Sequence, residues 1–483
     1  MPNTPNLLFI LTDQQRYDSL RCYGNDWIQA PALNRLAEQS FVFENAYVSQ
    51  PVCTPARSTI MTGLYPHTSG QVRNGIFLRP DTKTIAEMVS DDYLRGHFGK
   101  WHLGNDLVPQ HGFEQWISIE DLHLLPTERP DRFSDYHHYL IEHGYEPKTD
   151  AFGPRVFSED EKNRIPIAHH QSTFLGDHAA RFIQSAGDNP FMLFVDFVEP
   201  HPPYTGPLDG LYDPESLPTG PAFLKRPDGT SQFNTARADY YLSEERSDPA
   251  GIHVVGGHDL SSEAGWRRLR AQYFANITLL DRAVGKILAA LDDSGLAENT
   301  VVVFTSEHGE MGGDHAMLEK RSFYEEASRV PLLIRAPFVD GQPRTIGGNI
   351  GQVDLVPTLL ELLKQPVPED LQGRSRAKVL EGNNTLGDND VFVQWNGAGD
   401  RDLGNEAINR LSAMPRRSVI TANRWKLNLC ATDQGELFDL GSDPHETTNL
   451  FDAPEHRDRI RDMAARIRQW QIETGDDAPL PAF

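Results

Sequence analysis

Strand-length apolar runs alternate with stretches of helical periodicity along the first three quarters of the chain. Buried strands are predicted at residues 7–11, 191–198, 301–304 and 330–334. Amphipathic helices are predicted at residues 33–41, 269–291 and 355–363. This alternation is typical of a large, mostly parallel sheet flanked by helices, so the predicted fold class is α/β.

Near residue 375 the pattern changes to short strands followed by one helix. The strand-like runs lie at residues 391–395, 418–421, 425–429 and 436–440. One face of the last helical stretch carries Ile460, Met463, Ala464 and Ile467. We therefore predict a large α/β domain over residues 1–375 and a smaller C-terminal α+β subdomain over residues 376–483, built on a short antiparallel sheet.

Two long segments interrupt the alternation in the larger domain. Residues 104–170 are rich in His, Pro, Asp and aromatic side chains, and residues 202–262 are rich in Pro, Gly and charged side chains. Neither segment shows a sustained period. Insertions of this length in a compact domain are usually functional loops, so we expect both to shape a binding pocket.

The chain of 483 residues is strongly acidic, with 45 Lys and Arg against 69 Asp and Glu and a formal net charge of −24. Such a surface repels polyanions, which excludes a general nucleic-acid or anionic-membrane binder. No apolar run approaches the ~20 residues of a membrane span. The start of the chain lacks the basic end and apolar core of a signal peptide, so the expected location is cytoplasmic. A leader removed earlier would instead make it periplasmic or secreted.

Polar side chains follow directly after several of the predicted strands. Asp13, His201 and the pair Glu307-His308 each lie just past a strand end. In parallel sheets, ligands gather at the carboxyl ends of the strands.

The segment from Cys53 to Gly63 carries the sharpest chemical signal. Pro55 suits the first turn of a helix, so Cys53 is expected at a helix N-terminus, where free N–H groups favour an anion. Arg57 lies one helical turn further on. This arrangement suits attack on a tetrahedral oxyanion, although these residues alone fit a structural cysteine beside a surface arginine equally well.

The same segment matches the sulfatase signature Cys-x-Pro-x-Arg-x-x-x-x-Thr-Gly at every specified position. Further segments resemble other motifs of that family in the expected order, and they lie at residues 8–14, 99–104, 305–310, 320–325 and 436–444. On these motifs the chain resembles the type I, formylglycine-dependent sulfatases of the alkaline phosphatase superfamily. The resemblance covers nearly the whole chain and makes residues 1–375 the catalytic domain.

The resemblance implies an enzyme that hydrolyses sulfate esters of carbohydrates or aryl alcohols and releases inorganic sulfate. It implies that a formylglycine-generating enzyme converts Cys53 to Cα-formylglycine, whose hydrate is the nucleophile. The implied catalytic residues are Cys53, Arg57, Lys100, His102, His201 and Lys320, with Asn74 contacting substrate. The implied ligands of one divalent metal are Asp13, Gln14, position 53, Glu307 and His308. Calcium is the expected metal, with manganese or magnesium as alternatives.

Two positions depart from the common family pattern. Gln14 stands where many relatives have a second aspartate, as in a subgroup that includes phosphonate monoester and phosphodiester hydrolases. Glu307 replaces an aspartate, which moves the carboxylate by about one bond length, ~1.5 Å. The alternatives are therefore a phosphonate monoester or phosphodiester hydrolase using the same site, and a non-catalytic sulfatase-like binding protein.

Candidates for the leaving-group pocket come from the two inserted segments and the C-terminal subdomain. They are Trp116, Arg155, Tyr204, Lys225, Arg226, His253 and Trp395. Each side chain could stack on or hydrogen-bond to a sugar, although a surface or packing role is the commoner one for any single residue of these types. The sequence gives no prediction of the oligomeric state.

Overall fold

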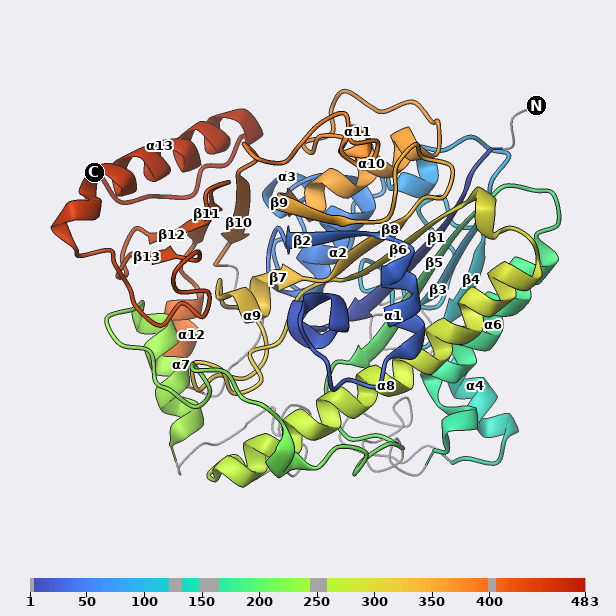
Figure 1. Cartoon of the computed structure of the whole chain (residues 1–483), viewed down its shortest axis with the longest axis horizontal. Coiled ribbons are helices and arrows are strands. Elements are labelled where there is room, and N and C mark those ends of the chain that lie inside the picture. Colours follow the sequence, from blue (N-terminus) through green and yellow to red (C-terminus); the bar gives the residue numbers. More distant parts are fainter. Residues whose placement is uncertain (1–3, 121–132, 147–164, 244–258, 398–404, 483) are drawn as a thin grey trace.

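A nine-stranded, mostly parallel sheet runs through the middle of the protein, with helices on both faces (Figure 1). The computed structural model describes residues 4–120, 133–146, 165–243, 259–397 and 405–482. The large sheet consists of β1 (Asn6–Asp13), β2 (Phe41–Tyr47), β3 (Leu94–Gly99), β4 (Gln115–Ser118), β5 (Phe191–Pro200), β6 (Thr300–Ser306), β7 (Arg329–Val330), β8 (Leu332–Arg335) and β9 (Thr345–Gly351).

The strand order is β4-β3-β5-β1-β6-β8-β2-β7, and β9 pairs with β2. The neighbours from β4 to β6 are all parallel, whereas β8 runs antiparallel to both β6 and β2. The described α-helices are α1 (Pro31–Glu38), α2 (Cys53–Thr62), α3 (Pro66–Ser69), α4 (Asp135–Glu142), α6 (Gln171–Ser185), α7 (Gln232–Leu242), α8 (Glu263–Asp293), α9 (Glu325–Ser328), α10 (Leu355–Leu362), α11 (Ala377–Leu380), α12 (Glu406–Ser412) and α13 (Arg457–Thr474). The described 3₁₀ helices are η1 (Tyr17–Ser19), η2 (Arg21–Tyr23), η3 (Ile85–Glu87), η4 (Ile167–His169), η5 (Pro214–Ser216), η6 (Ala297–Asn299), η7 (Gln352–Asp354) and η8 (Pro454–His456).

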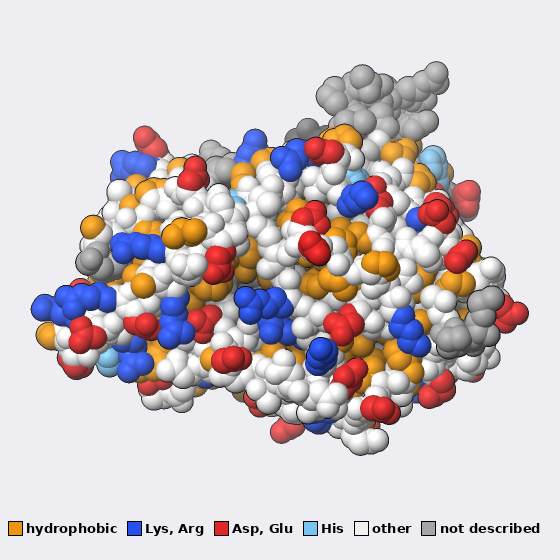
Figure 2. Space-filling view, turned by 90° about the horizontal axis from the view of Figure 1, so that it is seen from above, with side chains coloured by type: hydrophobic (Ala, Val, Ile, Leu, Met, Phe, Trp, Pro, Cys, Tyr) orange, Lys and Arg blue, Asp and Glu red, His pale blue; other side chains and the backbone are white. Residues whose placement is uncertain are grey.

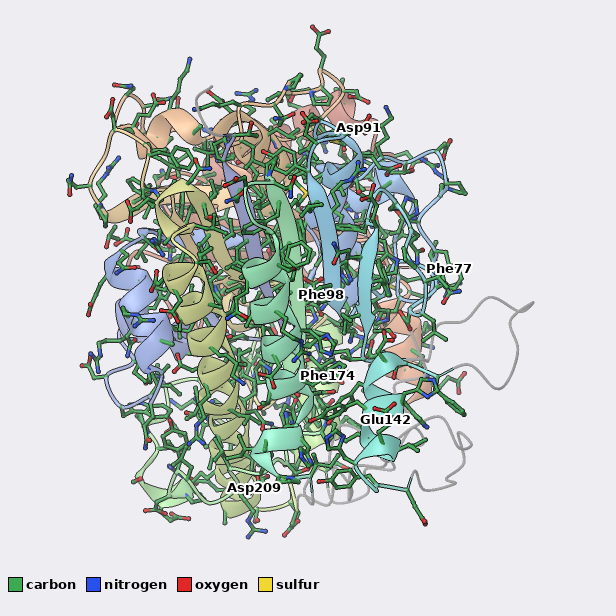
Figure 3. All side chains as sticks on the ribbon, turned by 90° about the vertical axis from the view of Figure 1, so that its right-hand side faces the viewer. Phe77, Asp91, Phe98, Glu142, Phe174 and Asp209 are labelled. Atoms are coloured by element: carbon green, nitrogen blue, oxygen red, sulfur yellow. The ribbon has the colours of Figure 1, made fainter. Side chains whose placement is uncertain are left out.

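Alternate residues of the central strands enter two separate cores. In β1, Leu7, Phe9 and Leu11 pack on the face covered by α2 and α10, while Leu8 and Ile10 pack on the face covered by α1, α6 and α8. Figure 3 shows α6 and α8 side by side over that second face. Because both faces are covered, β1 is buried along its whole length and its run from Leu7 to Leu11 is continuously apolar, as is usual for parallel strands.

A second sheet, antiparallel and four-stranded, follows in the chain, as predicted. Its strands are β10 (Val391–Trp395), β11 (Arg416–Ile420), β12 (Trp425–Cys430) and β13 (Glu436–Asp439). One face packs on α13, whereas Val393, Ile420 and Phe438 join the same core as Leu7 and Phe9. The small sheet therefore shares a core with the large one, and the predicted fold class is confirmed.

Two details of the predicted elements were wrong. The helix predicted over residues 33–41 ends at Glu38, because the buried run Phe41-Val42-Phe43 begins β2 instead. The segments predicted as loops contain regular structure: β4, α4 and η4 in the first, and η5 and α7 in the second. Among the described residues, no helix combines the length and apolar character needed to cross a membrane.

Candidate active site

Four neighbouring strands deliver polar side chains to one edge of the large sheet. Asp13 ends β1, Lys100 follows β3, His201 follows β5 and Glu307 follows β6. These strands are adjacent and parallel, so their carboxyl ends lie together. The side chains that the sequence placed past strand ends thus meet at the edge where parallel sheets bind ligands.

Cys53 begins α2, as the position of Pro55 predicted, and its side chain is buried. Its sulfur lies 3.3 Å from Lys320 Nζ and 3.4 Å from His308 Nε2. The next backbone amide, of Thr54, donates to Asn74 Oδ1 at 3.0 Å. Cys53 therefore lies at a helix N-terminus among nitrogen donors, a setting that favours an anion.

The electrostatics of Cys53 differ from those of a structural cysteine. Burial acts to raise the pKa of its thiol, but Lys320, Lys100 and His308 outweigh burial and hold that pKa well below its usual value. At Cys22, which lacks such cationic neighbours, burial raises the thiol pKa to about 12 despite an opposing backbone hydrogen bond. A lowered thiol pKa is typical of a reactive cysteine, so the environment of Cys53 favours a nucleophile over a structural cysteine.

Asp13, Cys53, Glu307 and His308 form a compact buried cluster in which one ligand atom from each lies within 4.8 Å of the others. His308 Nε2 is 3.0 Å from Glu307 Oε1 and 3.7 Å from Asp13 Oδ1. Asp13 Oδ1 has no hydrogen-bond partner among the described residues.

The electrostatics of this cluster call for a cation. Burial raises the pKa of Glu307 well above its ordinary value, and Asp13 and Cys53 add to the rise despite Arg57. A bound dication would neutralise the repulsion between these two buried carboxylates. Oxygen ligands with one imidazole are a donor set that calcium, magnesium or manganese accepts. The residues present thus fit a divalent metal.

Arg57 is wholly buried and bridges two carboxylates. Its Nη1 lies 3.0 Å from Asp196 Oδ2 and donates to Lys100 O at 2.6 Å, while its Nε pairs with Glu307. Asp196, which His97 also approaches at 3.3 Å, was missed by the sequence analysis. A carboxylate inside the apolar run of β5 was the available signal, because a buried charge in a strand requires a partner.

Gln14 lies between a basic and an acidic side chain. Lys320 Nζ donates to Gln14 Oε1 at 2.8 Å, and Gln14 Nε2 donates to Glu310. Tyr204 OH donates to the same Glu310 oxygen at 2.7 Å. The backbone of Gln14 is left-handed, with φ of 70°, which is uncommon for a residue with a side chain and is found at functional sites.

The two predicted proton-transfer histidines also lie beside Cys53. A side-chain hydrogen bond from His102 contributes to the lowered Cys53 pKa, and Thr54 Oγ1 donates to His102 O at 2.9 Å. His201 shares a side-chain hydrogen bond with Cys53, and its Nδ1 lies 2.8 Å from Pro202 O. Burial lowers the pKa of His201. Every residue implied by the resemblance, Asn74 included, is therefore in or next to one cluster.

The leaving-group candidates are less concentrated. Three of them are bonded internally: Trp116 Nε1 donates to Asp106 O, Trp395 Nε1 donates to Ser412 O, and Tyr204 OH donates to Glu310. Tyr204 and Trp395 are buried, and Trp116 is half-buried. Lys225 and Arg226 are exposed, and Arg226 pairs with Asp239. Arg155 and His253 lie outside the described residues.

Cationic side chains balance the carboxylates of this cluster. Figure 2 shows Lys and Arg side chains interspersed with Asp and Glu over one face of the protein. At the site itself, Arg57, Lys100 and Lys320 accompany the carboxylates of Asp13 and Glu307. The local charge can therefore favour an anion even though the whole chain carries −24.

Comparison with known proteins gives matches over nearly the whole chain. The model of the family described as Sulfatase matches residues 5–365, and that described as N-sulphoglucosamine sulphohydrolase, C-terminal, matches residues 313–473. An ulvan-active sulfatase from Formosa agariphila is 28% identical over 99% of this chain and 83% of its own length. An N-acetylglucosamine-6-O-sulfatase from Bacteroides thetaiotaomicron is 26% identical over 98% of this chain and 88% of its own length.

Among solved structures, the phosphonate monoester hydrolase SpPMH from Silicibacter pomeroyi is similar, with a TM-score of 0.79 and 25% identity. The similarity covers 97% of this chain and 96% of that one. The fold and the length of the chain are thus similar to those of that phosphonate monoester hydrolase.

Proposed function

Because the chain belongs to the sulfatase family and is therefore a sulfuric ester hydrolase, we propose that it hydrolyses carbohydrate sulfates, with the side chain of residue 53 as the nucleophile. The observation that carries the proposal is Cys53 at the start of α2, with Lys320 Nζ and His308 Nε2 within 3.4 Å of its sulfur. The carbohydrate substrate rests on the relatives named for ulvan and for N-acetylglucosamine-6-O-sulfate.

We propose that a formylglycine-generating enzyme converts Cys53 to Cα-formylglycine before the protein acts. The family's aldehyde hydrate supplies the oxygen that attacks sulfur and a second hydroxyl that lets sulfate leave, which a thiol cannot do. A buried helix N-terminus suits such a group, because its N–H donors and the neighbouring Lys320 stabilise negative charge there.

Asp13, position 53, Glu307 and His308 would hold one divalent metal, with calcium as the proposed ion. The side-chain carbonyl of Gln14, next to Asp13 in the chain, is the proposed fifth ligand. The metal would acidify the nucleophile and attract a sulfate oxygen. Lys100 and Arg57 are held by carboxylates at the edge of the cluster, where their charge opposes the charge that grows on the sulfate oxygens.

Proton transfer falls to the two histidines. His201 Nδ1 faces Pro202 O, which leaves Nε2 to exchange a proton with the leaving alcohol oxygen. His102 lies against Cys53 from the segment that follows Lys100 and is proposed to take the proton from position 53 when sulfate departs.

A phosphonate monoester or phosphodiester is the second candidate substrate. Gln14 supports it, because an amide in place of a second aspartate lowers the negative charge beside the metal by one. The likeness to the phosphonate monoester hydrolase supports it as well. The sulfatase relatives match more than nine tenths of the chain, and they favour the sulfate ester as the first candidate substrate.

The deciding experiment compares kcat/KM on paired aryl sulfate and aryl phosphodiester substrates with the same leaving group. We expect sulfate to be preferred and Cys53→Ser to abolish multiple turnover on both substrates. Preference for the phosphodiester by a wide margin would establish the second candidate. Full activity of Cys53→Ala would remove position 53 from the mechanism.

A further inference from the structure

Glu310 is a buried carboxylate on which four hydrogen-bond donors converge. Its Oε2 accepts from Gln14 Nε2 and from Tyr204 OH, the latter at 2.7 Å. Its Oε1 accepts from the backbone amides of Gly312 at 2.7 Å and Glu319 at 2.6 Å. The side chain is 1% exposed. Both carboxylate oxygens are thus saturated by donors from separate parts of the chain.

The orientation of the Gln14 amide follows from its two neighbours. An ionised carboxylate such as Glu310 only accepts hydrogen bonds, and a lysine ammonium such as Lys320 only donates them. Gln14 satisfies both when its nitrogen faces Glu310 and its oxygen faces Lys320, and the opposite orientation satisfies neither. An acidic side chain at position 14 would place its carboxylate against the carboxylate of Glu310.

Glu310 also fixes the chain immediately before Lys320. The amide of Glu319 donates to the Glu310 side chain, and the amide of Met311 donates to Glu319 O at 2.9 Å. The next residue, Lys320, places its Nζ 2.8 Å from Gln14 Oε1 and 3.3 Å from Cys53. One carboxylate therefore holds both partners of the Gln14–Lys320 contact.

We propose that Glu310 is the positioning residue that turns Gln14 Oε1 toward the metal group and aims Lys320 at position 53. It also explains why an amide suits position 14, because Glu310 requires a hydrogen-bond donor there. The inference rests on the proposed function, since the metal group gives the orientation its purpose.

The first test exchanges donor and acceptor in metal-free protein. Gln14→Glu leaves two carboxylates facing each other, so we expect the Tm of the chelator-treated variant to fall. The double variant Gln14→Glu/Glu310→Gln again pairs one donor with one acceptor and should recover at least half of the lost Tm. Additive losses in the double variant would overturn the proposed pairing.

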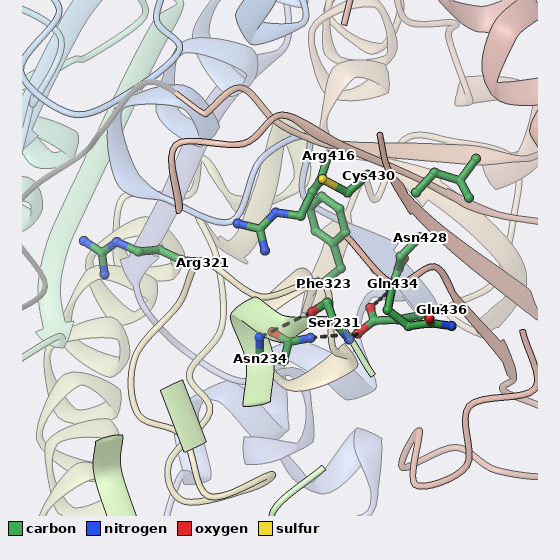
Figure 4. A pocket seen from close by; sticks show the side chains of 10 residues that line it. Ser231, Asn234, Arg321, Phe323, Arg416, Asn428, Cys430, Gln434 and Glu436 are labelled. Carbon is green, nitrogen blue, oxygen red and sulfur yellow. Dashed lines mark hydrogen bonds between the residues drawn. The ribbon is translucent and has the colours of Figure 1, made fainter. Parts of the chain in front are cut away.

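The second test measures Ca²⁺ binding by calorimetry. In Glu310→Gln a donor faces the Gln14 amide nitrogen, so the amide turns and Ca²⁺ affinity falls by about 10- to 100-fold. Glu436→Gln is the matched control. Glu436 is also a buried carboxylate, accepting from Ser231 N, Asn234 Nδ2 and Asn428 Nδ2, but it lies at the boundary of α7 and the small sheet (Figure 4).

We expect Glu436→Gln to lower Tm while leaving Ca²⁺ affinity unchanged. Equal Ca²⁺ affinity in Glu310→Gln and wild type would overturn the positioning role. If wild-type protein binds no Ca²⁺ and shows no chelator-sensitive activity, the proposed metal fails. The Tm coupling of positions 14 and 310 still tests Glu310 in that case.

Discussion

Removing Lys426 should destabilise the protein strongly and in a pH-dependent way. This lysine of β12 is fully buried, and its Nζ lies 2.8 Å from both Glu325 Oε1 and Glu446 Oε1. It also donates to Phe323 O at 2.8 Å. The small sheet is thereby tied to the segment that follows Lys320.

Lys426→Met leaves two buried carboxylates without their shared cation. Removing one partner of a buried ion pair costs about 3–5 kcal/mol, whereas an exposed pair is worth about 0–1 kcal/mol. The matched control is Lys286→Met, since Lys286 pairs with Asp177 at the surface. We expect urea titrations to show that Lys426→Met lowers the free energy of unfolding by about 3–5 kcal/mol. The control Lys286→Met should lower it by about 0–1 kcal/mol.

The pH dependence gives the sharper test. Burial raises the pKa of Glu446 to about 7 in the folded protein, although Lys426 opposes the rise. Since the folded state then binds a proton that the unfolded state releases, stability falls as pH increases from the ordinary value of 4.5 to about 7. Without Lys426 this penalty grows, so the loss in Lys426→Met should be larger at about pH 8 than at about pH 5. A loss no greater than that of Lys286→Met, or one independent of pH, would refute the reasoning.

Four further outcomes are expected. Asp196→Asn removes one carboxylate from Arg57 and should lower kcat on an aryl sulfate by up to about 10²–10³-fold, and an unchanged kcat would separate Asp196 from the chemistry. Glu307→Asp shortens the side chain whose carboxylate contacts both Arg57 and His308. Calorimetry should therefore show Ca²⁺ affinity reduced by about 10- to 100-fold, and equal or tighter binding would contradict this. Chelation should abolish turnover and lower Tm, with both restored by Ca²⁺; full activity of metal-free enzyme would exclude the metal. Because the chain carries −24, kcat/KM for a sulfated substrate should rise or stay level with inert salt, and a steep fall would mean that attraction outside the pocket dominates.

The strand ends and the helix of the signature were predictable because their signals are local. Asp13, Glu307 and His201 follow apolar runs, and Cys53 begins a helix whose first turn Pro55 indicates. A parallel sheet then brings separate strand ends together without further information. The placement of the site therefore follows from the pattern of elements.

Positioning contacts could not be predicted in this way. Glu310 meets residues 296 and 106 positions away, at Gln14 and Tyr204, and no local pattern encodes that meeting. Tyr204 is a candidate sugar contact by sequence, but in the structure its hydroxyl points into the protein and donates to Glu310. Asp196 was within reach of sequence reasoning, because a carboxylate in a fully buried strand requires a cation.

The most direct test of the account is mass spectrometry of the peptide containing Cys53, from protein produced with a formylglycine-generating enzyme. We predict that this peptide carries an aldehyde in place of the thiol and that the converted fraction tracks sulfatase activity across preparations. A peptide carrying only the thiol in fully active protein would contradict the account, because the proposed nucleophile would be absent while sulfate esters were still hydrolysed.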